Sequence, residues 1–410
     1  MRLPYTLTVY LLLLLCGCNK NPGKAIDGLS NQLPMAINFF TEEGIQYGEP
    51  YLLTYQGKTF LSFRETENNT HRLRYTILQE DGWASPVTIA TGNNWFVNWA
   101  DYPQLVALPK GNMLSFYLEK SGPSTFSYDI MVTTSTEGMN WDEAKILHDD
   151  AKKVEHGFVS LQPYDENVFI AWLDGRNTAE ETHHGHTQVH GEHGPMSLRG
   201  AITDIKGNKL HEWELDQRVC DCCQTTSAIT DNGPIVVYRG RSITEIRNIN
   251  IIRLVNGQWT KPKPIYDDNW MIKGCPVNGP RAAATGNHLA IAWFTEAQGK
   301  AEVKVIFSED GGATFGHPIL INEGHTIGRV DIAMLDTDMA VVTWMEGPLI
   351  LARKVKKDHS LGPVITVAKS SDNRSSGFPQ LTVNNGHLIL AWTDSNEAYP
   401  QIKTAILKDF

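Results

Sequence analysis

The chain lacks two features that would direct it to nucleic acid or into a membrane. It has no excess of basic residues, because 36 Lys and Arg stand against 46 Asp and Glu and the net charge is −10. Nucleic-acid binding depends on neutralising phosphates with cationic side chains, so we expect no nucleic-acid partner. Beyond the N-terminal segment, no hydrophobic run approaches the length needed to span a bilayer. Contact with a membrane is therefore expected only at the N-terminus.

The N-terminal segment has the pattern of an export signal. Arg2 supplies a positive charge, residues 5–15 are apolar, and the sequence Leu-Cys-Gly-Cys ends at Cys18. This pattern resembles the lipobox at which bacterial lipoprotein signal peptides are cleaved before a cysteine. It predicts a signal peptide over 1–17, lipid attachment at Cys18 and a polar tether over 18–35, with an ordinary secretory signal as the alternative. The resemblance implies a lipid-anchored protein of the bacterial cell envelope, in the outer membrane and facing the periplasm or the exterior.

One short phrase recurs seven times along the chain and predicts the fold. Each copy joins an aliphatic residue, a small or β-branched residue and an aromatic residue, in a run that is too short for a helix. The middle residues of the copies are Ser62, Ser115, Ala171, Val237, Ala292, Thr343 and Ala391. A period of about fifty residues with several strands per unit is typical of a β-propeller, whose blades must stack around an axis to bury their faces.

The strands of a single unit can be followed in the sequence. Residues 51–55, 59–64, 72–79 and 86–90 predict a four-stranded antiparallel blade with Gly-containing turns. The last unit supplies only three strands, at 380–383, 388–393 and 402–407. We expect residues 36–41 to supply the fourth strand and to close the ring without an open sheet edge. The fold class is therefore all-β, with one seven-bladed propeller over residues 36–410.

Two segments carry a family resemblance. Residues 308–315, Ser-Glu-Asp-Gly-Gly-Ala-Thr-Phe, match the Asp box, and residues 135–141 are a degenerate copy. The acidic side chain of such a box caps turn amides while the aromatic packs beside the sheet, so the box holds a turn together. The chain resembles the bacterial BNR/Asp-box sialidase-like propellers of the exo-α-sialidase type. That resemblance implies six blades as the alternative count.

Active members of that family use an arginine triad on a substrate carboxylate, a Tyr nucleophile assisted by Glu, and an Asp acid. The Arg-Ile-Pro segment that usually supplies the first arginine is absent from this sequence. The family's catalytic residues therefore cannot be assigned here one by one, and candidates must come from the topology.

The loops of four-stranded blades fall on two faces of a propeller. Turns between the first and second and between the third and fourth strands, including the Asp boxes, emerge on one face, which we call the Asp-box face. Loops between the second and third strands and between blades emerge on the other, which we call the loop face. Most chemically unusual residues of the sequence are predicted on the loop face, at the mouth of the central channel, where propellers place ligand sites.

Arginines and acids on the loop face predict an anion site. Two or three converging guanidiniums would bind a carboxylate, sulfate or phosphate. The ligand-binding candidates are Arg64, Arg176, Arg239, Arg241 and Arg247, of which Arg64, Arg176 and Arg241 are expected to line one cavity. By analogy with retaining sialidases, the catalytic candidates are Asp101, Asp174 and Glu245 as acid or base, and Tyr238 or Tyr102 as nucleophile. Alternatively, the arginines pair with nearby acids and join the blades.

Cysteines and histidines on the same face predict a metal site. The cysteines are Cys220, Cys222, Cys223 and Cys275, and the histidines are His183, His184, His186, His190 and His193. Thiolates and imidazoles are the ligand set of Cu(I) and Zn(II). We expect the four cysteines to lie close together, either as metal ligands or as two disulfides. The histidine loop alternatively binds metals only adventitiously.

These observations predict a monomeric, lipid-anchored, extracytoplasmic propeller that binds an anionic glycan or another small anionic ligand. Hydrolysis is left open, and an enzyme of this kind would be a glycoside hydrolase of the exo-sialidase type. One alternative is a copper- or zinc-binding lipoprotein that uses the cysteines and histidines. Another is a non-enzymatic propeller that recognises a protein partner.

Overall fold

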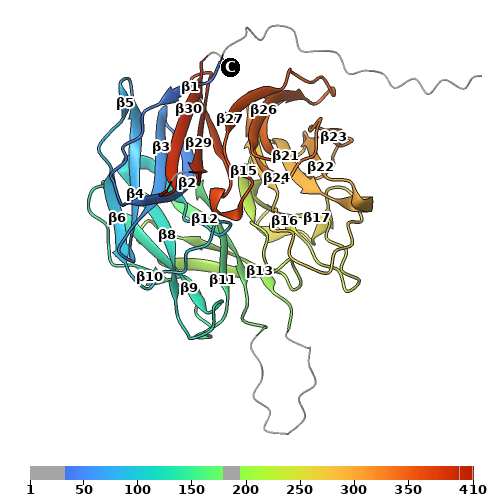
Figure 1. Cartoon of the computed structure of the whole chain (residues 1–410). Coiled ribbons are helices and arrows are strands. Elements are labelled where there is room, and N and C mark those ends of the chain that lie inside the picture. Colours follow the sequence, from blue (N-terminus) through green and yellow to red (C-terminus); the bar gives the residue numbers. More distant parts are fainter. Residues whose placement is uncertain (1–32, 179–193, 397, 409) are drawn as a thin grey trace, which may run out of the picture.

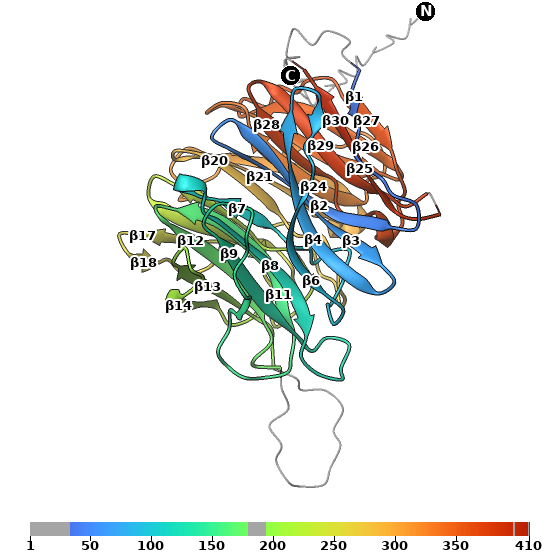
Figure 2. The same ribbon diagram turned by 90° about the vertical axis from the view of Figure 1, so that its left-hand side faces the viewer.

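The computed structural model describes residues 33–178, 194–396, 398–408 and 410. In these residues the chain forms seven antiparallel sheets arranged around a central axis, which is a seven-bladed β-propeller (Figures 1 and 2). The predicted fold class and blade number are confirmed, and the alternative count of six is wrong. No helix in the described part of the chain is long and apolar enough to cross a membrane.

The blades follow one another in chain order. Blade 1 contains β2 (Gln46–Tyr55), β3 (Lys58–Glu67), β4 (Thr70–Gln79), β5 (Gly82–Trp83) and β6 (Val87–Gly92). Blade 2 contains β7 (Leu105–Ala107), β8 (Met113–Lys120), β9 (Tyr128–Ser135) and β10 (Lys145–Ile146), and blade 3 contains β11 (His156–Tyr164), β12 (Asn167–Asp174), β13 (Ser197–Thr203) and β14 (Lys209–Asp216). Blade 4 contains β15 (Thr226–Thr230), β16 (Gly233–Arg239), β17 (Ile249–Val255), β18 (Gln258–Trp259) and β19 (Lys263–Pro264).

Three further blades complete the ring. Blade 5 contains β20 (Arg281–Thr285), β21 (His288–Thr295), β22 (Glu302–Ser308) and β23 (Ile319–Leu320), and blade 6 contains β24 (Gly328–Met334), β25 (Met339–Glu346), β26 (Leu349–Lys356) and β27 (Ile365–Lys369). Blade 7 contains β28 (Gln380–Asn384), β29 (His387–Asp394), β30 (Gln401–Leu407) and β1 (Met35–Ile37). Short 3₁₀ turns occur at η1 (Pro109–Gly111), η2 (Ala297–Gly299) and η3 (Arg374–Ser376).

The seven repeated phrases form the second strand of each blade, and their middle residues are all buried. These strands are covered on both sides because neighbouring blades pack face to face; for example, Phe116 of blade 2 and Trp172 of blade 3 share one apolar cluster. Trp172, Trp293 and Trp344 are completely buried. Each of these indoles donates a hydrogen bond to a carboxylate, which satisfies its one polar atom inside the core.

The two ends of the chain close the ring, as predicted. Strand β1 pairs antiparallel with β30, with Ala36 opposite Ala405. Trp83 of blade 1 donates a hydrogen bond to Thr404 Oγ1 at 3.0 Å, and Thr404 donates to the carbonyl of Ile37 at 2.9 Å. The pairing ends at Ile37 rather than at residue 41, because the chain then leaves the sheet and packs Phe39 against the Phe63 ring at 5.0 Å.

The segment at the end of β22 that resembles an Asp box forms a turn held by its own side chains. Asp310 accepts hydrogen bonds from the backbone N–H of Thr314 at 2.8 Å and from its hydroxyl at 2.6 Å. Ser308 Oγ accepts from the N–H of Gly312 at 2.9 Å. Because β1 is antiparallel to β30, the chain enters the propeller on the Asp-box face, near the C-terminus (Figure 1). The loop face lies at the opposite end of the strands and points downward in Figure 1.

Candidate functional site

A polar cavity of about 140 Å³ lies on the propeller axis. Its lining comes from the first strands of all seven blades or from residues next to them, and includes Tyr51, Gln104, Gln162, Ser227, Arg281, Asp331 and Gln380. Arg281 is buried there, with its Nε 3.8 Å from Asp331 Oδ1 and its guanidinium over the Tyr102 ring at 5.7 Å. Asp331 also accepts hydrogen bonds from the backbone amides of Ile332 and Leu381. The cavity thus contains an arginine that sequence reasoning did not select.

The three arginines expected in one cavity are instead paired with carboxylates. Arg64 forms a two-point contact with Glu49, at 2.6 and 2.8 Å. Arg176 forms a similar contact with Asp174, at 2.8 Å for both nitrogens. Arg241 binds Glu245, and none of the three lines the axial cavity. The expected shared anion site is therefore not formed, because each guanidinium already has a carboxylate partner of its own.

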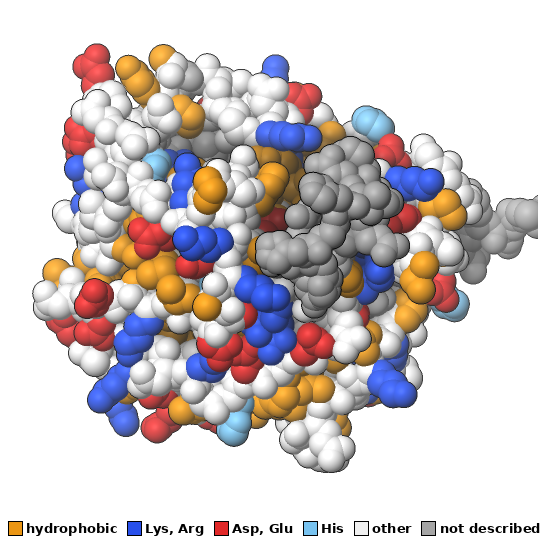
Figure 3. All heavy atoms as spheres, turned by 90° about the horizontal axis from the view of Figure 1, so that it is seen from below, with side chains coloured by type: hydrophobic (Ala, Val, Ile, Leu, Met, Phe, Trp, Pro, Cys, Tyr) orange, Lys and Arg blue, Asp and Glu red, His pale blue; other side chains and the backbone are white. Residues whose placement is uncertain are grey.

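The other two candidate arginines lie in the loops around blade 4. Arg239 is buried and, among the described residues, donates to the backbone carbonyls of Asn278, Arg247 and Phe294, which joins blades 4 and 5. Arg247 donates to Glu245 at 2.8 Å and to Cys220 Sγ at 3.2 Å. Acidic and basic side chains are interspersed on the loop face (Figure 3). This arrangement matches the alternative in which the arginines join the blades.

The catalytic candidates Asp101, Asp174, Tyr238 and Glu245 do not form one constellation. Tyr238 is buried and donates a hydrogen bond to Asp216 at 2.5 Å. Glu245 accepts hydrogen bonds from Arg241, which together with Arg247 lowers its pKa. Tyr102 lies beside the axial cavity under the guanidinium of Arg281. These groups belong to separate networks because each pairs with a neighbour in its own or an adjacent loop.

Asp101 does take part in a chain of polar groups between blades 2 and 3. The Tyr128 hydroxyl lies 3.1 Å from Asp101 Oδ2 and 2.9 Å from Glu155 Oε1. Asp101 Oδ1 accepts a hydrogen bond from the backbone N–H of Phe158 at 2.7 Å. A side chain at Gly157 would collide with Asp101, so glycine permits this approach. Sequence reasoning selected Asp101 but missed Tyr128 and Glu155.

Protonation of a carboxyl group explains how the Tyr128 hydroxyl can contact both Asp101 and Glu155. Burial raises the pKa of Asp101 to about 7, although its hydrogen bonds to Phe158 and Tyr128 oppose the increase. Burial also raises the pKa of Glu155 to about 8. A tyrosine hydroxyl has one hydrogen and can donate to only one carboxyl group, so the second contact requires a protonated carboxyl. We call Asp101, Tyr128 and Glu155 the carboxyl–tyrosine chain.

Aromatic side chains border the carboxyl–tyrosine chain on the loop face. The ring of Phe96 stacks on that of Tyr128, with centroids 3.9 Å apart and planes 8° from parallel. Phe126 meets Phe96 edge-on at 6.3 Å, and 54% of its surface is exposed. Phe96 lies in the connection between blades 1 and 2, and Phe126 lies between β8 and β9, so both emerge on the loop face. The exposed ring of Phe126 is therefore linked through Phe96 to Tyr128, which contacts buried Asp101 and half-buried Glu155.

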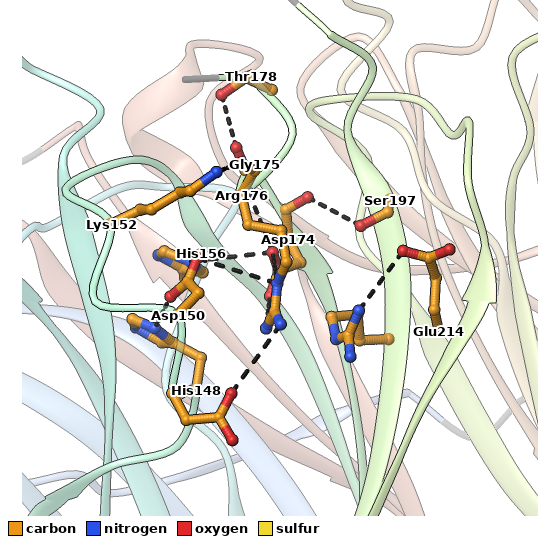
Figure 4. A network of polar contacts seen from close by, with 12 residues as sticks. His148, Asp150, Lys152, His156, Asp174, Gly175, Arg176, Thr178, Ser197 and Glu214 are labelled. Carbon is orange, nitrogen blue, oxygen red and sulfur yellow. Dashed lines mark hydrogen bonds and ion pairs between the residues drawn. The ribbon is translucent and has the colours of Figure 1, made fainter. Parts of the chain in front are cut away.

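A second network in the same region contains two histidines (Figure 4). The rings of His148 and His156 stack 3.5 Å apart and 6° from parallel. Asp150 contacts both, at 2.8 Å from His148 Nδ1 and 3.1 Å from His156 Nε2. Asp174 lies beside His156 and binds Arg176, and its pKa is lowered to about 2 because these partners outweigh its burial. Asp174 is thus held as a carboxylate.

The cysteines lie together between blades 3, 4 and 5, as the topology predicted. Cys222 forms a disulfide with Cys275, whereas Cys220 and Cys223 are buried thiols with sulfurs 2.9 Å apart. Burial alone would raise the pKa of the Cys220 thiol. The Cys223 thiol, the Cys222 amide and the guanidiniums of Arg239 and Arg247 outweigh burial and lower this pKa below its ordinary value, to about 7. For Cys222 and Cys275 the structure matches the alternative in which the cysteines form disulfides. Metal binding by the cysteines stays a prediction.

Several candidates lie outside the described residues. They are the lipidation site Cys18 and the histidines His183, His184, His186, His190 and His193. Conversely, the structure reveals residues that sequence reasoning did not select, which are Tyr128, Asp129, His148, Asp150, Glu155, His156 and Arg281. Tyr128 and Asp129 start the third strand of blade 2, His148, Asp150 and Glu155 lie in the connection between blades 2 and 3, and His156 starts the first strand of blade 3. The rule that sorts loops by face could have placed them on the loop face.

No protein-family model and no curated protein sequence matches this chain. A protein of unknown function from Dyadobacter fermentans is similar in structure, with a TM-score of 0.52 and 13% identity over 91% of this chain and 98% of that one. The α-L-arabinanase of Penicillium chrysogenum, solved with arabinobiose, has a TM-score of 0.51 and 10% identity over 92% and 97%. Polysaccharide lyase Uly1 has a TM-score of 0.52 and 8% identity over 94% of both chains. At these identities the likeness establishes the fold alone.

Proposed function

We propose that the protein binds a glycan on its loop face, at the seam between blades 2 and 3. The observation that carries this proposal is the carboxyl–tyrosine chain. It runs from buried Asp101 through buried Tyr128 to half-buried Glu155. Exposed Phe126 lies near this chain on the same face. Aromatic rings offer apolar surface to the C–H faces of sugars, and carboxyl groups bond their hydroxyls. The fold shared with an arabinanase solved with arabinobiose and with a polysaccharide lyase supports a carbohydrate ligand.

The proposal extends to glycan cleavage by the same residues. The sialidase-like resemblance implies a Tyr, a Glu and an Asp in the reaction, and these three residue types are in contact at Asp101, Tyr128 and Glu155. Carboxyl groups that exchange protons with a substrate are the usual acids and bases of glycoside hydrolysis. An anionic sugar is not required, because the loop-face arginines Arg64, Arg176 and Arg241 already have carboxylate partners.

Binding can be tested by screening the purified protein against arabinan, uronic-acid and sialylated oligosaccharides, followed by calorimetry on the best ligand. We expect Phe126→Ala and Glu155→Gln each to weaken binding by about tenfold or more, which corresponds to about 1.4 kcal/mol. Glu309→Gln is the matched control, because Glu309 is exposed at the Asp box on the opposite face. Absence of any glycan ligand, or unchanged affinity in both loop-face variants, would contradict the proposal.

Cleavage can be tested separately with the same ligands by measuring released reducing ends or free sialic acid. We expect Glu155→Gln to reduce turnover more strongly than binding, because its carboxyl acts on the reacting bond. We expect Tyr128→Phe to do the same indirectly, because it removes the hydroxyl that holds the Glu155 carboxyl. A wild-type protein that binds a glycan without cleaving it would remove the enzymatic part of the proposal and leave the binding part.

We also propose that the mature chain is anchored by lipid on Cys18. The support is the lipobox-like sequence and the entry of β1 on the Asp-box face, which would direct the loop face away from the membrane. Cys18→Ser should move the protein from the membrane fraction to the soluble fraction. If the variant keeps its membrane association while its signal segment is intact, lipidation at Cys18 is excluded.

A further inference from the structure

One histidine in the seam between blades 2 and 3 is oriented by one carboxylate and faces another. His148 Nδ1 lies 2.8 Å from Asp150 Oδ1, and because a carboxylate only accepts, Nδ1 carries the hydrogen. The lone pair of the neutral ring is then on Nε2, which lies 3.4 Å from Asp129 Oδ1. Both atoms are buried, and neither has a hydrogen-bond partner within the described residues. Two acceptor atoms that face each other repel unless a proton or a metal ion lies between them.

The distance between these two atoms matches that between neighbouring ligands of a metal ion. Nitrogen and oxygen ligands each lie about 2.1 Å from Zn²⁺, and at the tetrahedral angle this places them about 3.4 Å apart. A nitrogen of His156 completes a group with Asp129 and His148 whose ligand atoms all lie within 4.8 Å of one another. His156 Nε2 contacts Asp150 at 3.1 Å and Nδ1 contacts the Tyr128 carbonyl at 3.3 Å, so a bound ion would replace one of these contacts. Only 6% of the surface of His148 is exposed, so water does not freely compete for Nε2.

Asp150 has the position of the carboxylate that typically supports a metal-binding histidine. Such a carboxylate accepts the hydrogen of the distal ring nitrogen, fixes the tautomer and holds the ring in place. Asp150 does this for His148 and also contacts His156 Nε2 at 3.1 Å, which keeps the two rings stacked. The histidines are therefore held in place by protein contacts, independently of any bound ion.

The surrounding charges favour a cation. The carboxylates of Asp129, Asp150 and Asp174 lie around the two rings, and Glu119 is opposite Asp129 in the pairing of β8 with β9. Arg176 is a cationic side chain among them and is held by Asp174 (Figure 4). A divalent ion would offset the excess of negative charge with a single occupant.

We propose that Asp129, His148 and His156 bind a divalent transition-metal ion of the Zn²⁺ class, with Asp150 as the positioning carboxylate. Imidazole and carboxylate ligands suit Zn²⁺ and its first-row neighbours better than Ca²⁺ or Mg²⁺, which prefer oxygen ligands alone. This site is separate from the cysteine cluster and does not depend on glycan binding. Its failure would leave the proposed function untouched, because Phe126 and the Glu155 carboxyl are not ligands.

The test uses the full-length protein as purified and after treatment with a chelator. Elemental analysis of the untreated protein should find one equivalent of metal. Calorimetric titration of the chelated protein should find one tight Zn²⁺ site and a higher melting temperature with Zn²⁺, but no such effect of Mg²⁺. We expect Asp129→Asn, which keeps the side-chain shape, and His148→Gln each to weaken Zn²⁺ binding at least a hundredfold. Asp150→Asn should weaken it ten- to a hundredfold.

Three matched variants separate this site from other zinc ligands. One changes His183, His184, His186, His190 and His193 to Ala, a second changes Cys220 and Cys223 to Ser, and a third is His288→Gln, from an exposed cluster with Glu309 and Asp338. All three should keep the tight site. The proposal is overturned if the wild type binds no Zn²⁺ tightly, or if binding persists in Asp129→Asn and His148→Gln but is lost in a control. The metal-free melting temperature of each variant shows whether it is folded, and Asp129→Asn decides the question if His148→Gln is not.

Discussion

The two faces of the propeller are built from opposite ends of the same strands, yet their polar residues are organised differently. On the Asp-box face, Asp310 bonds Thr314 and Ser308 within a single exposed turn. On the loop face, buried Asp101 bonds Tyr128 and Phe158, which are 27 and 57 residues away. The first arrangement is local and repeats with the sequence motif. The second depends on how neighbouring blades are packed.

Several buried polar groups of the loop face lie in the seams between blades. The carboxyl–tyrosine chain joins blades 2 and 3, and Arg239 joins blades 4 and 5. Arg329 of blade 6 donates to Ser376 and Gly377 at the entrance to blade 7. Buried polar groups must find partners, so each seam both stabilises the ring and gathers reactive side chains. The comparison therefore predicts that loop-face substitutions cost more stability than equivalent Asp-box substitutions.

The largest effect is expected where the ring closes. Removing residues 1–37 deletes β1, leaves the outer edge of β30 unpaired and removes the carbonyl that Thr404 bonds. We expect the melting temperature to fall by roughly 10 °C or more, or the domain not to fold, because an open edge replaces a closed ring. A chain that begins at residue 33 is the matched control and should melt like the full chain. Equal melting temperatures for the two truncations would mean that β1 does not close the ring.

The fold could be predicted from the sequence because it repeats. Seven copies of one phrase, each buried in a second strand, fixed the blade number, and the missing strand of blade 7 indicated the closure. The Asp-box turn was equally predictable, because all its partners lie within a few residues. For the candidate site, the sequence predicted only the face of the propeller on which the residues lie. The topology brought the four cysteines together correctly, but it could not show that Glu49 neutralises Arg64 or that Tyr128 lies between two carboxyls.

The second-largest effect is expected on the loop face. Asp101→Ala leaves the N–H of Phe158 and the hydroxyl of Tyr128 without this partner in a buried seam. Such losses typically cost about 1–3 kcal/mol each, so we expect a decrease of about 3 kcal/mol in the free energy of unfolding. Denaturant-induced unfolding measures it, with Asp101→Asn as the control that keeps an acceptor. A loss below about 1 kcal/mol would mean that the seam does not depend on this carboxyl.

An effect of similar size is expected from pH, through the same residue. The pKa of Asp101 is raised by burial to about 7 in the folded protein, against an ordinary value of 3.8. The folded state therefore holds a proton that the unfolded state has released, and stability falls as the pH rises from about 4 to about 7. A pKa raised from 3.8 to about 7 corresponds to about 4 kcal/mol of stability, so the loss is comparable to that on removing the carboxyl. Asp101→Asn should reduce this slope in unfolding experiments at several pH values, and an unchanged slope would assign the proton elsewhere.

The smallest effect is expected on the Asp-box face. Asp310→Ala removes two hydrogen bonds to Thr314 in an exposed turn, where water can replace the lost acceptor. By analogy with the loss of a helix cap, we expect a decrease of about 1 kcal/mol in the free energy of unfolding. Glu137→Ala in the degenerate box of blade 2 should cost no more, because Glu137 accepts only from Asn140. If Asp310→Ala cost as much as Asp101→Ala, burial in a seam would not be what distinguishes the two faces, and the contrast between local turns and long-range networks would have to be abandoned.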